Sequence, residues 1–260
     1  SAGAIATQIQ GLSVAATGIT VPVGTAQPTN GTTGTGAIIT YGGISAGQGI
    51  VTAGDAWHSG VRVGTGASSI TSNTVIGNGA GNALLTGAAN LLIGYQAGAA
   101  LTSAGNNTAI GYQALLAQTQ TGGNNVAIGN QAMFTVNNTG CTNNTAIGYR
   151  ALGLGNGGFY SSTAIGYQAL GNLGAGYNNT AIGYNAGNQI SSGAGNLCIG
   201  YNSGNALGLQ NNVVIIGSAT GSGVVNGQVI ISDGSANTRM DFNGTSGDAK
   251  IYSTTAASTT

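Results

Sequence analysis

One short segment of this chain recurs along most of its length. NNTAIGYQAL, at residues 106–115, returns with few changes at 143–152, 161–170 and 178–187. The dipeptide Ile-Gly at its centre occurs nine times, at spacings of 17, 17, 18, 19, 18, 17, 17 and 17 residues. The nine isoleucines are Ile76, Ile93, Ile110, Ile128, Ile147, Ile165, Ile182, Ile199 and Ile216. A fixed period of this size indicates a stacked repeat fold in which each copy packs on its neighbours.

Each repeat carries a short run of strand-forming residues, with the consensus Asn-Thr-Ala-Ile-Gly. Alternate residues of a strand share a face, so the Ile and Thr positions point one way and the Ala position points the other. Both faces are apolar or nearly so, which is typical of a strand buried on both sides. We therefore expect the Ile column to fill the interior of a coil and the Ala column to face a partner chain. The alternative is a wider monomeric solenoid with a half-exposed Ala face.

The predicted fold is all-β: a parallel β-solenoid or β-roll of about nine 17–19-residue repeats. Successive turns would stack about 4.8 Å apart, so that Ile, Asn and Tyr form ladders of like on like. Stacked Asn amides can hydrogen-bond to one another. The Tyr rings, which follow Gly in six copies, either pack on each other or offer their faces to glycans.

Charge is nearly absent from the chain, as such ladders require. Charged residues make up 3% of it, there is no Glu, and Arg150 is the sole formal charge between Thr71 and Ser232. A charge repeated at ladder spacing would repel its neighbours. Neutrality also argues against nucleic-acid binding. No run of 18 apolar residues is present, so we expect no membrane insertion.

Three regions are expected. Residues 1–72 lack the repeat, contain both prolines, and read as an attachment module or an irregular cap. Residues 73–221 are the repeat domain, in which Leu115, Met133 and Leu152 are expected as the apolar feet of longer loops and Leu170 holds the same position before a shorter one. Residues 222–260 regain charges and Asp-Gly turns typical of hairpins, before a tail that should fray. The first 20 residues lack the basic start of a signal peptide, and the beginning at Ser1 suggests processing or trimming.

The chain offers almost no raw material for catalysis. It has one His and four Asp, too few for a triad or a carboxylate pair, and His58 near Asp55 reads as a turn contact. We predict no enzymatic activity and no cofactor. Ca²⁺ ligation by aspartates of the C-terminal region was weighed, but no calcium-binding repeat is present. The aspartates concerned are Asp233, Asp241 and Asp248.

Two further sets of residues favour structural over chemical roles. Cys141 and Cys198 lie three repeats apart, so we expect no disulfide between them. Among the Asn-x-Thr triplets, which match glycosylation acceptors, three fall at the same turn of the repeat, which favours a structural reading of these three. They begin at Asn106, Asn143 and Asn178.

NNTAIGYQAL resembles the repeats of two related kinds of protein. The heads of trimeric autotransporter adhesins carry Asn-Ser-x-Ala-Ile-Gly repeats that stack as a left-handed parallel β-roll and trimerise. Phage tail fibres carry Asn-Thr-Ala-Ile-Gly-Tyr-Gln-Ala repeats, often followed by a segment similar to IISDGSANTRMDFNGTSGDAKIY at residues 230–252. The resemblance covers residues 73–252. Repeats in adhesin heads are usually shorter, which leaves handedness and strands per turn open.

The resemblance implies a homotrimeric fibre, a tail or head fibre at the virion surface, with an extracellular or cell-surface location as the alternative. Its partners would be other copies of itself, a virion attachment protein at the N-terminal region, and a host surface receptor of glycan or protein. Loop aromatics are the candidate receptor contacts, the alternative being that they fold back over the neighbouring turn: Phe134, Phe159, Tyr160 and Tyr177. The rival functions are an ice-binding solenoid, although Leu and Val interrupt its Thr column, and a surface-layer or filament subunit that polymerises end to end.

Overall fold

A computed structural model describes residues 56–58, 61–66, 70, 72–116, 122–134, 141–155, 157–235 and 237–252. The chain divides into two compact units after Val51, and every described residue lies in the second. Most of the expected attachment region therefore lies outside the described residues, as do the tips of the loops after Leu115 and Met133. The attachment role of that region stays a prediction.

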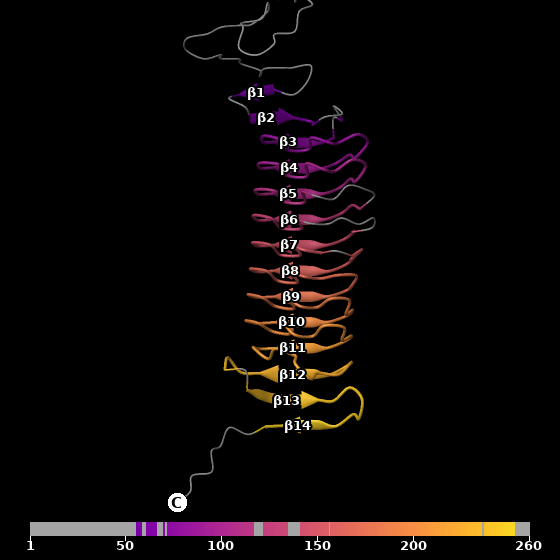
Figure 1. Ribbon diagram of the computed structural model, residues 1–260, viewed down its shortest axis with the longest axis vertical. Coiled ribbons are helices and arrows are strands. Elements are labelled where there is room, and N and C mark those ends of the chain that lie inside the picture. Colours follow the sequence, from indigo (N-terminus) through magenta and orange to yellow (C-terminus); the bar gives the residue numbers. More distant parts are fainter. Residues whose placement is uncertain are drawn as a thin grey trace, which may run out of the picture. The chain divides into compact units, whose positions relative to one another are not determined.

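The described residues form one sheet of fourteen strands, joined in chain order, and contain no helix (Figure 1). There is accordingly no helix in this part of the chain that could cross a bilayer. The strands are β1 (Ala56–His58), β2 (Val61–Gly64), β3 (Thr74–Ile76), β4 (Leu91–Ile93), β5 (Thr108–Ile110), β6 (Val126–Ile128), β7 (Thr145–Ile147), β8 (Thr163–Ile165), β9 (Thr180–Ile182), β10 (Leu197–Ile199), β11 (Val214–Ile216), β12 (Val229–Ser232), β13 (Thr238–Phe242) and β14 (Ala249–Ile251).

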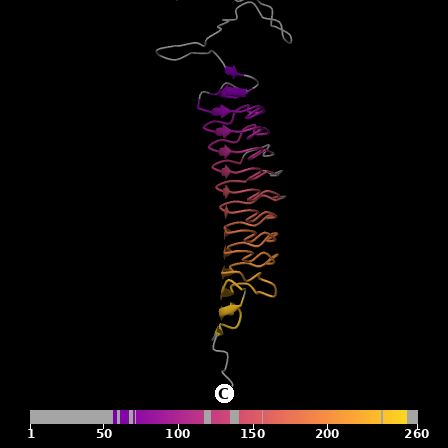
Figure 2. The same cartoon turned by 90° about the vertical axis from the view of Figure 1, so that its left-hand side faces the viewer.

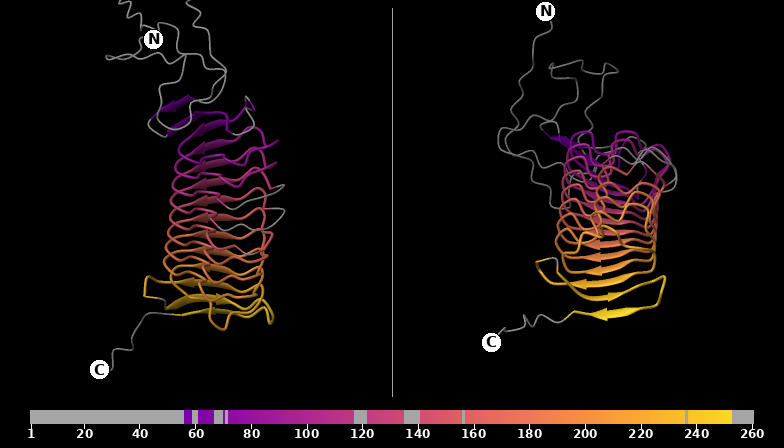
Figure 3. Two further views of the ribbon diagram at one scale, coloured as in Figure 1. Left: turned by 45° about the horizontal axis from the view of Figure 1, so that its top comes forward. Right: turned by 60° about the horizontal axis from the view of Figure 1, so that its bottom comes forward.

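The parallel β-solenoid predicted from the repeat is confirmed. Strands β3 to β12 pair in parallel, one strand per turn, and each Ile of the repeat lies opposite the Ile of the next turn, as Ile147 does with Ile165. The strands form one column, with the remainder of each turn behind it (Figure 2). Viewed obliquely from either end, successive turns superpose (Figure 3).

The Ile-Gly pair has a backbone cause. Gly148 follows its Ile with a φ of +128°, and the other glycines of the column have φ between +112° and +138°. A Cβ at Gly148 would lie 2.5 Å from the carbonyl oxygen of Gly166 in the next turn. Stacked turns approach too closely at this corner for any side chain, so only Gly fits in every copy.

The expected direction of the two strand faces is wrong, because the Ala column points into the coil. Ala146 is fully buried, whereas Ile147, the next residue, is 36% exposed. The same alternation holds in every repeat strand, whose central residue is buried and whose flanking residues are half-buried or exposed. The interior of a 17-residue turn is narrow. It is filled by the central strand residue on one side and by a second residue of the turn on the other, and not by the column of bulky isoleucines.

The second contribution to this core comes from the residue six positions after the central strand residue. Where the strand supplies a large side chain, this position is Gly; where the strand supplies Ala, it is mostly Leu or Met. A Cβ at Gly98, for example, would lie 2.8 Å from a methyl group of Leu92. The pairs are Val75/Gly81, Leu92/Gly98, Ala109/Leu115, Ala127/Met133, Ala146/Leu152, Ala164/Leu170, Ala181/Gly187, Cys198/Gly204 and Ile215/Gly221.

Two details complete this complementary packing. At the one pair with two small members, Ala181 and Gly187, the space is taken by Leu170 and Ile190, whose methyl groups would lie 2.8 and 3.0 Å from a Cβ on the Gly. Leu115, Met133, Leu152 and Leu170 keep the positive φ of the glycines they replace. These residues, expected as apolar feet of longer loops, are core residues. Their burial offsets a backbone conformation that costs about 1–2 kcal/mol in a non-Gly residue.

The predicted Asn ladder is present and buried. Asn125 Nδ2 donates to Asn107 Oδ1 at 3.0 Å, and Asn144 Nδ2 donates to Asn125 Oδ1 at 3.1 Å. Each Oδ1 also accepts from the backbone N–H of the next Asn, as from Asn144 at 3.0 Å. The amides thus satisfy one another and the backbone inside the turn, which a buried polar column requires. Ser162 interrupts the ladder between Asn144 and Asn179.

Antiparallel strands close both ends of the parallel stack. At one end β1 pairs with β2, and β2 pairs with β3. At the other end β12 pairs with β13, and β13 with β14. The hairpins expected after residue 221 are therefore present, but β12 still pairs in parallel with β11 and extends the coil by one strand.

Candidate interaction surface

The outward face of the sheet is an uncharged aliphatic and threonine surface. Each strand from β3 to β11 presents an Ile and, two residues earlier, a Thr, Leu or Val. Ile147, Ile182 and Ile216 are 36–40% exposed, and the remaining isoleucines of this column are half-buried. No charged residue lies on strands β3 to β12. Aliphatic side chains in contact with solvent along a whole sheet form the kind of patch that marks an interaction surface.

A tyrosine ladder borders this face, with a Tyr two residues after six of the nine strands from β3 to β11, in one stack of two rings and one of four. The rings of Tyr149 and Tyr167 stack at 5.0 Å between centroids, and those of Tyr167 and Tyr184 at 4.9 Å. Tyr95 with Tyr112, and Tyr184 with Tyr201, stack at 5.3 Å. The expectation that these rings pack on each other is confirmed. They nevertheless keep 37–63% of their surface exposed, so the ladder is both a stack and part of the outer surface.

The single charge of the repeat region is absorbed into a ladder of amides. Gln113 donates to Gln96 at 2.9 Å, and Gln131 donates to Gln113 at 3.2 Å. In the next turn Arg150 takes the Gln position, and its Nε donates to Gln131 Oε1 at 2.8 Å. Its guanidinium also lies 5.4 Å from the ring centre of Tyr149, within cation–π range. One cation is tolerated because the rung before it supplies an acceptor rather than a second charge.

The four predicted receptor contacts separate into different environments. Phe159 is fully buried and is a core residue, so of the two possibilities for this side chain the folded-back one is present and the exposed receptor contact is not. Its ring occupies the space over Gly155, where a Cβ would collide with it. Phe134 is half-buried and lies directly before residues outside the described part.

Tyr160 and Tyr177, in contrast, are exposed, by 43% and 41%. Their rings stack at 5.0 Å and are parallel within 3°. They lie three residues before β8 and β9, whereas the long tyrosine ladder lies after the strands, so the two aromatic groups flank opposite ends of the strands. A receptor role for Phe134, Tyr160 and Tyr177 stays a prediction.

An open hollow of about 400 Å³ lies beside Tyr177. It is lined by Tyr177, Asn178, Ala194, Gly195, Asn211, Asn212 and Asn226. Tyr177 is among the receptor contacts predicted from the sequence, whereas the asparagines beside it are not. A signal was present, since Tyr160 and Tyr177 are followed at the same repeat position by Ala194 and Asn211.

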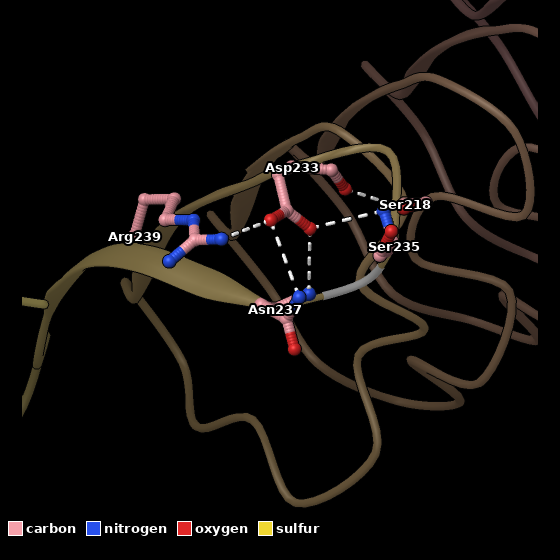
Figure 4. A network of polar contacts seen from close by, with 5 residues as sticks. All are labelled: Ser218, Asp233, Ser235, Asn237 and Arg239. Carbon is pink, nitrogen blue, oxygen red and sulfur yellow. Dashed lines mark hydrogen bonds and ion pairs between the residues drawn. The ribbon is translucent and has the colours of Figure 1, made fainter. Parts of the chain in front are cut away.

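The described residues bring no metal-binding or nucleophilic cluster together. They contain no group of three or more His, Cys, Asp or Glu side chains placed to hold a metal ion. Asp241 accepts from Gln228 at 2.6 Å, and Asp248 accepts from Ser246 at 2.7 Å. Asp233 is occupied separately, in a hairpin turn with Arg239 and Asn237 (Figure 4). The three aspartates weighed as calcium ligands thus have separate partners.

Both cysteines are free thiols in the core, as expected from their spacing. Burial raises the pKa of Cys198 to about 12. Burial also raises the pKa of Cys141, against a smaller opposite effect of a backbone hydrogen bond from Phe159. Since the thiolate is the nucleophile and metal ligand, neither side chain is placed for chemistry.

Comparisons with protein-family models, with curated proteins and with solved structures found no match to this chain.

Proposed function

We propose that this chain is a non-enzymatic structural fibre protein whose outward sheet face packs against other copies of itself to form a homotrimer. One observation carries the proposal. In every repeat the central residue of the strand is buried in the coil and the Ile after it lies at the surface, so an uncharged aliphatic column runs the length of the parallel sheet. In a monomer this column stays in contact with water, whereas an oligomer buries it.

A second copy of the chain is the partner that fits this face. Ten parallel strands span about 40 Å at the spacing of a sheet. A stable interface buries about 800 Å² per partner, so the contact must be about 20 Å wide. A strand of three residues covers only about 10 Å of that width, and the tyrosine ladder at its edge supplies further surface. An identical chain presents the same rung spacing and the same lack of charge.

A fibre of this kind provides reach and multivalent attachment. Three copies present every surface group three times, which raises avidity without any new contact. The resemblance to phage tail fibres and adhesin heads supports a host-attachment role at the virion surface. The correction to the strand faces moves the proposed trimer contact from the Ala column to the Ile and Thr columns.

The solution mass of the full chain tests this proposal. Light scattering during size exclusion should give three times the 25.0 kDa of one chain, and negative-stain images should show rods. Ile147→Arg with Ile165→Arg should yield folded monomer, because four or more desolvated charges would meet at the interface. Leu85→Arg is the matched control: Leu85 is 68% exposed and lies outside the sheet, so the trimer should persist.

Other masses and images decide between the rivals. A monodisperse monomer for the unmodified chain would refute the trimer. Filaments that lengthen with concentration would instead favour end-to-end polymerisation into a surface layer.

Ice binding is the second candidate, and one observation favours it. Thr145, Thr163 and Thr180 lie side by side on the outward face of adjacent strands, half-exposed. The Thr column was expected to be buried because Leu and Val interrupt it, but its side chains point outward. An ice-binding face must stay open to water, so this function requires a monomer with thermal hysteresis. A trimer without thermal hysteresis would exclude it.

A further inference from the structure

The short tyrosine stack stops abruptly at Ala194. Tyr160, Tyr177 and Ala194 occupy one repeat position in three successive turns. Tyr160 and Tyr177 form a β-bridge, and the backbone N–H of Gly195 donates to the carbonyl oxygen of Tyr177 at 2.9 Å. Tyr160 covers one face of the Tyr177 ring. On the other side, where the next rung would place a third ring, the side chain is a single methyl group. The hollow beside Tyr177 occupies this position.

The far wall of the hollow is fixed by backbone-anchored amides. Asn211 Oδ1 accepts from the backbone N–H of Ala194 at 2.7 Å, and Asn226 Oδ1 accepts from the backbone N–H of Asn211 at 2.8 Å. The acceptor oxygens are therefore engaged and the side chains are held in place. Gly195 leaves the bottom of the hollow free of a side chain, since a Cβ there would lie 2.5 Å from Asn212 Oδ1.

Two further amides at the rim remain available. Asn178 and Asn212 both adopt the left-handed conformation, with a φ of +56°. Within the described part of the chain, the side chains of Asn178 and Asn212 make no hydrogen bond. An amide supplies two donor hydrogens and an acceptor oxygen, so these two residues can bind a ligand without breaking existing contacts.

The lining selects a neutral, polyhydroxylated ligand. No charged residue lines the hollow, so neither an anion nor a cation would find a counter-charge. One wall is the electron-rich face of an aromatic ring, suited to the C–H groups of a sugar ring. The other walls are amides, which match hydroxyl groups as donors and acceptors. A volume of about 400 Å³ lies within the usual range of about 300–1,000 Å³ for small-molecule sites.

We propose that this hollow binds a neutral saccharide, with a sugar ring stacked on Tyr177 in the place of a missing third ring and its hydroxyls bonded to Asn178 and Asn212. This deepens the proposed attachment function and rests on it for its biological role. Binding is nevertheless measurable whatever the oligomeric state. One such site per chain gives three per trimer, so weak individual binding would still yield attachment.

Saturation-transfer NMR on the full chain tests the site directly. The probes are the methyl glycosides of glucose, galactose, mannose and N-acetylglucosamine, each titrated to about 20 mM, with glucuronic acid as a charged comparison. At least one neutral glycoside should bind saturably, with transfer from aromatic protons, and glucuronic acid should not. If none of the neutral probes binds, the proposal is overturned.

Completing the tyrosine stack provides the decisive variant. Ala194→Tyr adds a third ring at a position where the two preceding turns already carry one, so the ring is placed against Tyr177 and fills the hollow. We expect at least a tenfold loss of glycoside binding with no loss of thermal stability. Thr142→Tyr is the matched control, because Thr142 bridges to Tyr160 at the opposite end of the same stack. It adds a ring but leaves the hollow open, and binding should be unchanged.

A second variant guards against an effect of Ala194→Tyr on folding. Asn178→Gly with Asn212→Gly removes both rim amides and keeps the left-handed backbone that Gly adopts readily. Binding should again fall at least tenfold. Equal binding in the filled variant and the parent would place the sugar elsewhere and refute this site. The solution mass of each variant, measured in parallel, separates such a failure from a failure of the trimer.

Discussion

The inner and outer faces of the same three-residue strand follow opposite rules. The inward position holds five residue types in nine copies: Val, Leu, Ala, Cys and Ile. The outward position holds Ile in all nine. Inside, changes of volume are compensated by the residue six positions later in every copy except Ala181/Gly187, so the summed volume is constrained while the individual residues vary. Outside, the residue is constant although it lies at the surface. The difference indicates that the Ile at the outward position is kept constant by a constraint other than packing in the core of its own coil.

A charge placed on either face should separate the two most strongly. Ala146→Arg puts a guanidinium into a fully buried position with no counter-charge nearby, which costs several kcal/mol, comparable with the whole stability of a domain. We expect loss of the folded coil, seen as a collapse of the β-sheet signal in circular dichroism and rapid proteolysis. Ile147→Arg, one residue later and facing outward, should keep the signal.

The reverse result would overturn the assignment of faces. If Ala146→Arg folded and only failed to assemble, the Ala column would face a partner chain, as the sequence first suggested. The control excludes a general intolerance of Arg in this strand.

The sequence determined the architecture but not its sidedness. The period of 17–19 residues predicted the parallel stack, and stacking of like on like predicted the Asn and Tyr ladders, because both depend only on register. Alternation says which residues share a face, but with both faces apolar it cannot say which one points inward. The information lay in volumes: Leu92 with Gly98 and Ala146 with Leu152 compensate each other across six residues. Read as the start of loops, that column was not recognised as core.

The candidate hollow was out of reach of the sequence for a different reason. Its walls come from residues 177 to 226 on four successive rungs, which are brought together only when the turns are aligned column by column. Tyr177 is a candidate by its aromatic ring alone, but Ala194 becomes informative only when it is seen to place no ring beside Tyr177. The burial of Phe159 could not be predicted, because nothing in its local sequence distinguishes a loop tip from a side chain folded over Gly155.

The compensation inside the coil can be tested by exchanging the two sizes. Ala146→Leu should overpack the turn against Leu152 and cost about 1–3 kcal/mol. Leu152→Gly should leave a cavity and cost about 2–4 kcal/mol, less than a full Leu deletion because Gly relieves the positive φ. The double variant rebuilds the arrangement of Leu92 and Gly98 and should return to within about 1 kcal/mol of the parent. Denaturant midpoints of all four proteins give the coupling.

Additive losses in the double variant would contradict this account. A non-compensating pair supplies the control: Ala146→Leu with Leu101→Gly places the cavity in a turn three repeats away from the overpacked position. Sites so far apart should show no coupling.

The Asn ladder should be the next most sensitive inner feature. Asn125 receives two hydrogen bonds from Asn144 and donates one to Asn107 and one to Cys141 O. Asn125→Ala leaves buried donors and acceptors unpaired and should cost about 2–4 kcal/mol. Asn125→Ser should cost about half as much, because Ser162 at the same repeat position still accepts from the next backbone N–H, at 3.3 Å. Denaturant unfolding measures the cost, and hydrogen exchange should localise it to the adjoining turns.

Equal costs for Ala and Ser would show that the hydroxyl cannot substitute for the amide, and would leave the natural Ser162 rung unexplained. An exposed amide provides the comparison. Asn172→Ala removes a surface side chain whose bond to Asn188 is solvent-accessible, and should change stability by less than about 0.5 kcal/mol.

The smallest effect is expected in the C-terminal hairpins, which follow the stacked repeats and contain charged residues. Hydrogen bonds from the Arg239 and Asn237 side chains lower the pKa of Asp233 from 3.8 to about 2. A carboxyl whose pKa is lower in the folded state than in the unfolded state stabilises the folded state at pH values above its ordinary pKa. This contribution is lost as pH falls through about 2. The turn amides of Ser235 and Asn237 should therefore shift in NMR spectra with a midpoint near pH 2.

Arg239→Gln removes the main cause of this lowered pKa, so the midpoint should move towards 3.8. The coil should not respond in the same range, since Arg150 is the one formal charge between Thr71 and Ser232 and carries no acid-titrating group. A midpoint near 4 in the unmodified chain would mean that the turn is open in solution. Loss of the β-sheet signal along with the turn would mean that the C-terminal hairpins hold the coil together, and that the inner ladders are less self-sufficient than their hydrogen bonds indicate.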